Sequence, residues 1–232
     1  MKKTFLVIFL MSALLVKSQN HGFVTPFVGL GIPLGDYLYN GYALVGSNFG
    51  IEGGYYFKNK IGLGIRIAST TNQFDNYIFA YEFEDALNSS GISYNSISVD
   101  GGKWSLLNAG IGLYSTISIS QKFKLETKGV FGLLNVKSPY IDVRVSGPFY
   151  NMKIYENSSS VTSFQYNFEL AFKYFVSENF SINLYGGVIS SKPYFSTTVE
   201  STINGSKTVE NERFSQQILL INTGIGFTYV LQ

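Results

Sequence analysis

The chain has 232 residues, of which 45% are hydrophobic, 16% aromatic and only 14% charged, and its formal net charge is +2. Soluble domains carry about 25% charged residues, yet beyond residue 20 no apolar run approaches the ~18–20 residues of a membrane helix. The 24 glycines, 20 phenylalanines and 17 tyrosines are weak helix formers. This composition excludes a helical bundle, a polytopic helical membrane protein and a disordered chain.

Charge and cysteine content narrow the class further. The basic residues form no block, so we expect no nucleic-acid partner. The absence of cysteine excludes disulfides, thiolate metal sites and a lipid-modified N-terminal cysteine.

The first 18 residues have the pattern of a secretory signal peptide. Lys2 and Lys3 precede a mostly apolar stretch over 4–16, which is too short for a membrane span. We expect cleavage after Ser18, which divides the chain into a signal peptide, 1–18, and one β-barrel domain, 19–232. An uncleaved anchor or a buried strand is the alternative interpretation of this stretch.

The mature chain alternates apolar and polar residues with period two, which predicts strands with one apolar face. In 61–68, for example, Ile65 shares the apolar face with other branched residues, and Arg66 lies on the opposite face. Eight segments follow this pattern: 23–32, 49–57, 61–68, 108–118, 123–133, 164–174, 180–188 and 219–231.

The connections between these strands alternate strictly in length. Three are short, at 58–60, 121–122 and 176–179, and four are long, near 33–48, 69–103, 136–163 and 190–213. Outer-membrane barrels sort their connections in this way, with tight periplasmic turns and long outer loops. A β-sandwich has no reason to do so.

The two strand faces also differ in side-chain size. The polar face is rich in small residues, which suit the crowded lumen of a narrow barrel. The other face is bulky, with Phe57, Phe123, Tyr174, Phe180 and Tyr229 at strand ends, as in interfacial aromatic girdles. The predicted fold is an all-β, eight-stranded, antiparallel up-and-down transmembrane β-barrel with long extracellular loops.

The last strand carries the most specific motif. Asn222, Gly224, Phe227 and Tyr229 fit a polar-x-Gly-x-x-aromatic-x-aromatic pattern, although three further residues follow it. With this motif the chain resembles the bacterial outer membrane protein β-barrel domain family, which includes small OmpA/OmpX-type and PorT-like barrels. The resemblance implies that these four residues form an assembly signal for the barrel-assembly machinery. An ordinary amphipathic last strand gives the same alternation.

Charged residues recur on the inward face of the predicted strands. They number four cations and three anions: Glu52, Arg66, Lys124, Glu126, Lys128, Glu169 and Lys173. A proton or ion path is one interpretation. We favour a salt-bridged plug, because eight strands close too tightly for water to pass.

Nothing in the sequence predicts catalysis, a cofactor or a metal site. The only histidine, His21, lies at the start of the mature chain, where we expect it to be unanchored and unable to serve as a general base. Glu82, Glu84 and Asp85 lie in the longest loop but lack the spacing of a calcium site, so we expect a solvated acidic face.

Three functions remain open from the sequence. The first is an outer-membrane barrel, embedded in outer-membrane lipid with a filled lumen, that serves the envelope or binds an extracellular protein or surface ligand through its loops. The stretch 140–145 alternates like a strand, so strands are expected to project beyond the membrane and offer edges to partners. The alternatives are a small pore or lipid-modifying enzyme, and a secreted β-sandwich or lipocalin-like carrier.

Overall fold

The computed structural model describes residues 21–57 and 60–231. The predicted signal peptide and its cleavage after Ser18 lie outside the described residues. Within them, no helix is both long and apolar enough to cross a membrane.

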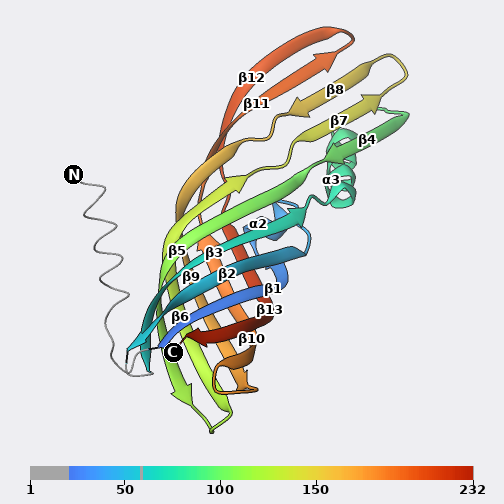
Figure 1. Ribbon diagram of the computed structural model, residues 1–232. Coiled ribbons are helices and arrows are strands. Elements are labelled where there is room, and N and C mark those ends of the chain that lie inside the picture. The colour runs from blue at the N-terminus through green and yellow to red at the C-terminus, as the bar shows by residue number, and fades with distance from the viewer. Residues whose placement is uncertain (1–20, 58–59, 232) are drawn as a thin grey trace, which may run out of the picture.

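Eight strands close into an antiparallel barrel (Figure 1). Each pairs with the next barrel strand along the chain, and the first pairs with the last, so the predicted up-and-down topology is confirmed. Most strands extend beyond the predicted segments, because the hydrogen-bonded ladder continues where the alternation of apolar residues fades. The barrel strands are β1 (His21–Pro33), β2 (Gly46–Phe57), β3 (Ile61–Gln73), β5 (Lys103–Ser118), β6 (Phe123–Lys137), β9 (Ser160–Phe175), β10 (Phe180–Ser191) and β13 (Ile218–Leu231).

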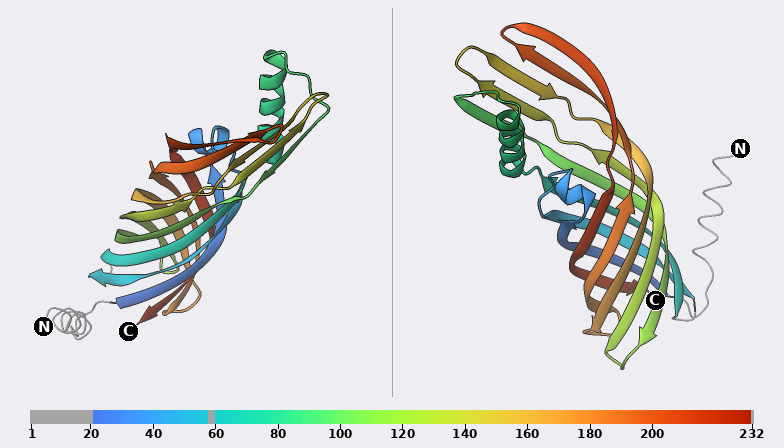
Figure 2. Two further views of the ribbon diagram at one scale, coloured as in Figure 1. Left: turned by 90° about the horizontal axis from the view of Figure 1, so that it is seen from above. Right: turned by 180° about the vertical axis from the view of Figure 1, so that it is seen from behind.

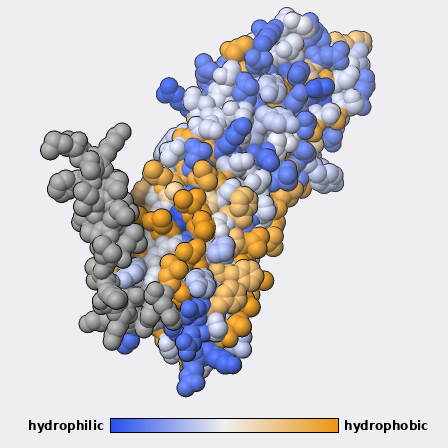
Figure 3. All heavy atoms as spheres, in the orientation of Figure 1, coloured by the Kyte–Doolittle hydropathy of each residue, from blue (hydrophilic) through white to orange (hydrophobic). Residues whose placement is uncertain are grey.

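The barrel is apolar outside and polar inside. In β3, Ile65 is 61% exposed and the neighbouring Arg66 is 1% exposed. The outward residues of β3 are apolar from Ile61 to Ile67 and become hydroxyl-bearing at Ser69 and Thr71. On the face drawn in Figure 3, apolar residues cover the barrel wall and hydrophilic residues cover the region above it. A closed barrel leaves no strand edge, so every backbone group of the wall can form its hydrogen bonds inside lipid. The apolar outer band is the surface that faces the lipid. The protein is therefore an integral outer-membrane β-barrel.

A second, open sheet projects from one side of the barrel (Figures 1 and 2). Its strand order is β12-β11-β8-β7-β4. Each of these strands is the neighbour along the chain of one barrel strand, and the corresponding barrel strands follow the same order, β13-β10-β9-β6-β5. The long connections were expected to be loops, and that part of the prediction is wrong for much of their length. The stretch predicted to be strand-like, 140–145, corresponds to a strand that spans Ile141–Ser146. The sheet comprises β4 (Ser96–Gly101), β7 (Ile141–Ser146), β8 (Asn151–Glu156), β11 (Tyr194–Ile203) and β12 (Ser206–Ser215).

Turn chemistry explains one of the sheet's two hairpins. Asn204 and Gly205 connect β11 to β12 and both have positive φ, at 48° and 85°. Two such residues match the right-handed twist of the flanking strands, so β12 folds directly back along β11.

Two helices occupy the remaining connections. The short α2 (Asp36–Tyr39) lies at the barrel mouth, and α3 (Asn76–Ser89) packs against the sheet. Asp75 caps α3 by accepting from the backbone N–H groups of Tyr77 and Ile78, both at 3.1 Å. Leu87 of α3 joins Val143 and Val145 of β7 in a separate apolar core. Burial of this apolar stripe holds the helix in place.

Candidate functional site

Six charged side chains meet in the middle of the barrel lumen. They come from β2, β3, β6 and β9, whose period-two alternation directs every second residue inward. All six are at most 5% exposed. The cluster has three cations and three anions: Arg66, Lys128, Lys173, Glu52, Glu126 and Glu169.

Lys128 is the centre of this lumen cluster. Its Nζ lies 2.5 Å from Glu52 Oε1, 2.8 Å from Glu169 Oε1 and 3.3 Å from Glu126 Oε1. The Lys128 ammonium donates hydrogen bonds to Glu52 and Glu169 and forms an ion pair with Glu126. Lys128 thus connects all three anions.

The other two cations complete the cluster on either side. Arg66 pairs with Glu169 and lies 3.7 Å from Glu52, with its guanidinium stacked 4.3 Å from the Phe27 ring centroid. Lys173 Nζ lies 2.8 Å from Glu126 Oε2. Because buried charges are costly unless they are paired, equal numbers of cations and anions are what this lumen requires.

Lys124, the seventh predicted member, lies apart from the cluster. It is partly buried, its Nζ lies 4.6 Å from the Phe175 ring centroid, and no ion pair joins it to another described residue. Lys124 is near the start of β6, four residues before Lys128. The sequence pattern identified its face correctly but not its depth.

Side chains also close the lumen above and below the lumen cluster. At the mouth, α2 inserts Tyr37, which is fully buried and whose hydroxyl donates to Asn72 Oδ1 at 3.2 Å. Trp104 packs edge-on against Tyr37 and donates its Nε1–H to the Gly41 carbonyl at 2.8 Å. Towards the other end, the Phe23 ring stacks on another ring, that of Tyr56, at 4.8 Å. The lumen is packed at three levels.

The residues of the proposed assembly signal lie on both faces of β13. Asn222 is buried in the lumen, whereas Phe227 and Tyr229 are 43% and 53% exposed on the outer wall. Gly224 is opposite Gly29 on one side and Tyr185 on the other. Two exposed aromatics on one side of the strand that closes the barrel form a lipid-facing stripe.

The outer face of the projecting sheet carries charge in rows across its strands. Directly paired residues form a basic row through Arg144, Lys153 and Lys207, with a threonine between the two lysines. The neighbouring row towards the barrel is acidic: Asp100, Asp142 and Glu200.

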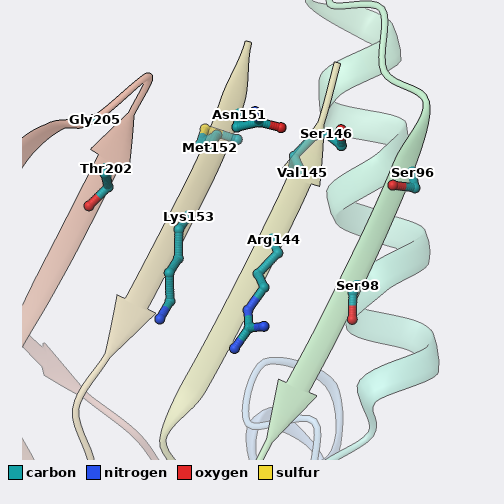
Figure 4. A pocket seen from close by; sticks show the side chains of 10 residues that line it. All are labelled: Ser96, Ser98, Arg144, Val145, Ser146, Asn151, Met152, Lys153, Thr202 and Gly205. Atoms are coloured by element: carbon teal, nitrogen blue, oxygen red, sulfur yellow. The ribbon is translucent and has the colours of Figure 1, made fainter. Parts of the chain in front are cut away.

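Ion pairs join the two rows, one along β7 and two diagonally between neighbouring strands. Arg144 lies 2.8 Å and Lys153 3.6 Å from Asp142, and Lys207 lies 2.8 Å from Glu200. Figure 4 shows Arg144 and Lys153 on adjacent strands, with their side chains extending in the same direction. Both residues line a shallow hollow of about 340 Å³. Like charges placed directly opposite each other, as Arg144 and Lys153 are, destabilise a sheet. The ion pairs with the acidic row offset this repulsion.

The remaining predicted chemistry is located as follows. His21 is the first residue of β1, where it pairs with Tyr56, so the expectation of an unanchored position is wrong for its backbone. Glu82, Glu84 and Asp85 lie on α3 rather than in a loop, because the connection that contains them is helical. No group of three or more His, Asp or Glu side chains in the described part of the chain could hold a metal ion.

Comparisons with known proteins add the following findings. No protein-family model and no curated protein sequence matches the chain. Among solved structures, it is similar to a major outer membrane protein of Thermus thermophilus, at 11% identity over 92% of this chain and 100% of that one, with a TM-score of 0.48. It is also similar to Ail of Yersinia pestis, at 13% identity over 88% and 97% of the two chains, with a TM-score of 0.38. The neisserial surface protein NspA matches at 15% identity over 91% and 97%, with a TM-score of 0.36.

Proposed function

We propose that this protein is a non-conducting, non-catalytic outer-membrane anchor that presents a recognition sheet to an extracellular protein or surface ligand. The observation that carries the proposal is the continuation of the chain from five of the eight barrel strands into one ordered sheet beyond the mouth. A protein that served only as a membrane plug would need no such sheet.

The packed lumen supports a closed barrel rather than a pore. Six paired charges occupy its middle, and Tyr37 and Trp104 close the mouth. Eight strands leave a lumen only wide enough for side chains. In planar bilayers we expect the purified protein to give no steady single-channel currents. Reproducible open-channel steps would promote the pore alternative.

The charge rows support recognition by the outer face of the sheet. Arg144 and Lys153 are opposed to each other and share one carboxylate, Asp142. A partner that adds negative charge beside the basic row supplements the single carboxylate that these two cations share. Electrostatic complementarity of this kind mainly sets specificity and association rate.

A matched pair of variants tests the recognition sheet. Cells displaying the protein are assayed on an array of immobilised extracellular-matrix proteins and of neutral and anionic polysaccharides. The double variant Arg144→Ser/Lys153→Ser should lose binding that the parent shows. The control Lys60→Ser/Lys122→Ser removes the same charge beside the turns at the opposite end and should keep that binding.

Folding of both variants in the outer membrane is checked by the faster migration of unheated membrane samples on a denaturing gel. If the intact protein binds no member of the array above cells that lack it, or if both variants bind equally, the recognition proposal is wrong.

We also propose that the chain belongs with the small OmpA/OmpX-type and PorT-like barrels and that it is inserted by the barrel-assembly machinery. The eight-stranded up-and-down order and the aromatic stripe of Phe227 and Tyr229 support this assignment. Substituting both aromatics by serine should lower the amount of heat-modifiable protein in the outer membrane. Unchanged insertion would remove the assembly role of these residues.

A further inference from the structure

A cavity of about 240 Å³ lies where the barrel mouth meets the concave side of the projecting sheet. It is separate from the charge rows, because its sheet residues belong to the opposite face. Its wall comprises the turn after α2, the start of α3, and the ends of β8 and β12 nearest the barrel. These segments are far apart in the sequence and are brought together by closure of the barrel.

Aromatic rings form most of the apolar wall of this mouth cavity. Tyr42, Phe74 and Phe79 pack on one another with ring centroids 5.1–5.5 Å apart. Trp104 and Phe214 line other parts of the wall. The indole N–H of Trp104 is already bonded to the Gly41 carbonyl, so the ring is fixed in place.

Tyr42 adopts an unusual backbone conformation to reach this wall. Its φ is +48°, in the left-handed region that bulky residues seldom occupy. Such conformations are strained and collect at functional sites. The Tyr42 hydroxyl donates to Glu82 Oε2 at 2.5 Å, which fixes the ring.

Two carboxylates carry the charge of the wall. Glu156 on β8 is partly buried, and Glu212 on β12 lies near enough to interact with it. Burial, and secondly the charge of Glu212, raise the pKa of Glu156 above its ordinary value. Among the residues that the structure describes, no lysine or arginine forms an ion pair with either glutamate. A partly buried carboxylate beside a second one is therefore left without a balancing cation.

We infer that the mouth cavity binds a small organic cation, an ammonium or guanidinium group attached to a compact apolar body. Aromatic faces attract cations within about 6 Å of the ring centroid, and the two carboxylates supply the opposite charge. The volume equals that of about eight liquid water molecules, which suits a choline-sized or lysine-sized group. A hydrated inorganic ion would gain little from a wall of rings.

The chain contains its own reporter for this site. Trp104 is the only tryptophan of the 232 residues, and it lines the cavity. In the full-length protein refolded in detergent, all tryptophan fluorescence therefore comes from a residue in the wall of the mouth cavity. The titrants are choline, agmatine and the tripeptide Gly-Lys-Gly.

A neutral ligand of the same shape tests the role of charge without any substitution. 3,3-Dimethylbutan-1-ol replaces the quaternary nitrogen of choline by carbon. We expect choline to change the fluorescence saturably, and the neutral analogue to bind at least tenfold more weakly. Equal binding of the two, a stronger response to Ca²⁺ than to any organic cation, or no saturable response to any titrant would overturn the inference.

Substitutions then test the residues. Glu156→Gln keeps the shape of the side chain and should weaken cation binding at least tenfold. Glu210→Gln is the control, because Glu210 is exposed on the same strand as Glu212 but does not line the cavity. The affinity of Glu210→Gln for the cation should stay within twofold of that of the parent protein. An unchanged affinity in Glu156→Gln contradicts the inference.

The titrants also distinguish two sources of the cation. Tighter binding of Gly-Lys-Gly than of choline and agmatine indicates a basic side chain of a protein partner. The reverse order indicates a free small molecule. Either order supports the site itself, which does not depend on recognition by the outer face of the sheet.

Discussion

The barrel wall and the projecting sheet are consecutive stretches of the same chain with opposite polarity. In the barrel, the exposed face is apolar and the enclosed face carries paired charges, as at Ile65 and Arg66. In β7, the enclosed face is apolar at Val143 and Val145, and the exposed face carries Arg144. The strand geometry is the same in both regions. The difference shows that the surrounding solvent, lipid or water, decides which face is apolar.

Between the barrel and the sheet, the positions whose side chains are enclosed change from even-numbered to odd-numbered residues. In β6 the even-numbered residues, such as Leu134 and Val136, face the lumen, whereas in β7 the odd-numbered Val143 and Val145 are enclosed. The connecting segment contains Pro139, which cannot donate to a strand ladder. A break at this point lets one chain satisfy two environments.

The largest expected effect contrasts a buried cation with an exposed one. Lys128→Met leaves three buried carboxylates facing two cations, and we expect it to lower the free energy of unfolding by about 3–5 kcal/mol. Arg144→Met removes an exposed partner of Asp142 and should change the free energy of unfolding little. Reversible unfolding in lipid, followed by heat-modifiable migration, measures both. Equal losses would show that the lumen and the sheet do not differ as described.

The second expected effect contrasts the two exposed faces. Ile65→Arg places a cation in the middle of the apolar band of β3 and should cost about 2–4 kcal/mol. Val209→Arg places the same cation on the outer face of β12, which water reaches and where Glu200 lies opposite. It should leave the stability unchanged in the same assay. A tolerated arginine at position 65 would mean that this wall does not face lipid.

A smaller effect tests whether the region above the barrel is stable on its own. Asp75→Ala removes the cap of α3 and should cost about 1 kcal/mol of local stability. Hydrogen exchange should become faster in 76–89, whereas exchange in β5 and β6 stays as slow as in the parent. Faster exchange throughout the barrel would show that the two regions unfold together.

The smallest effect is a titration on the outer face of the sheet. The Arg144 side chain hydrogen-bonds Asp142 and holds the pKa of that carboxyl below its ordinary value. A lowered carboxyl pKa adds stability above the unfolded-state pKa, which is lost as the pH falls through the folded-state pKa. In Arg144→Ser, the Asp142 pKa should rise towards its ordinary value, as seen by carboxyl-carbon NMR. The control Lys207→Ser should leave the Asp142 pKa unchanged.

Much of the barrel follows from local sequence. Ile65 and Arg66 are adjacent in the chain and their side chains point in opposite directions, because successive residues of a strand alternate in direction. The period-two pattern therefore predicts the eight strands and their inward and outward faces without knowledge of any partner strand. It also selects the residues of the lumen cluster, since charges on an otherwise small-residue face have nowhere else to point.

Tertiary structure alone decides which of these residues meet. Lys124 and Lys128 share a face of β6, but only Lys128 reaches the carboxylates, because strand stagger and closure set the depth of each residue. Glu156 and Glu212 are 56 positions apart and meet only because β8 and β12 both flank β11. The ordered sheet was expected only in part, since above the membrane the enclosed face depends on what packs there. Alternation is local and can be predicted from the sequence, whereas register, closure and packing are non-local and appear only in the folded chain.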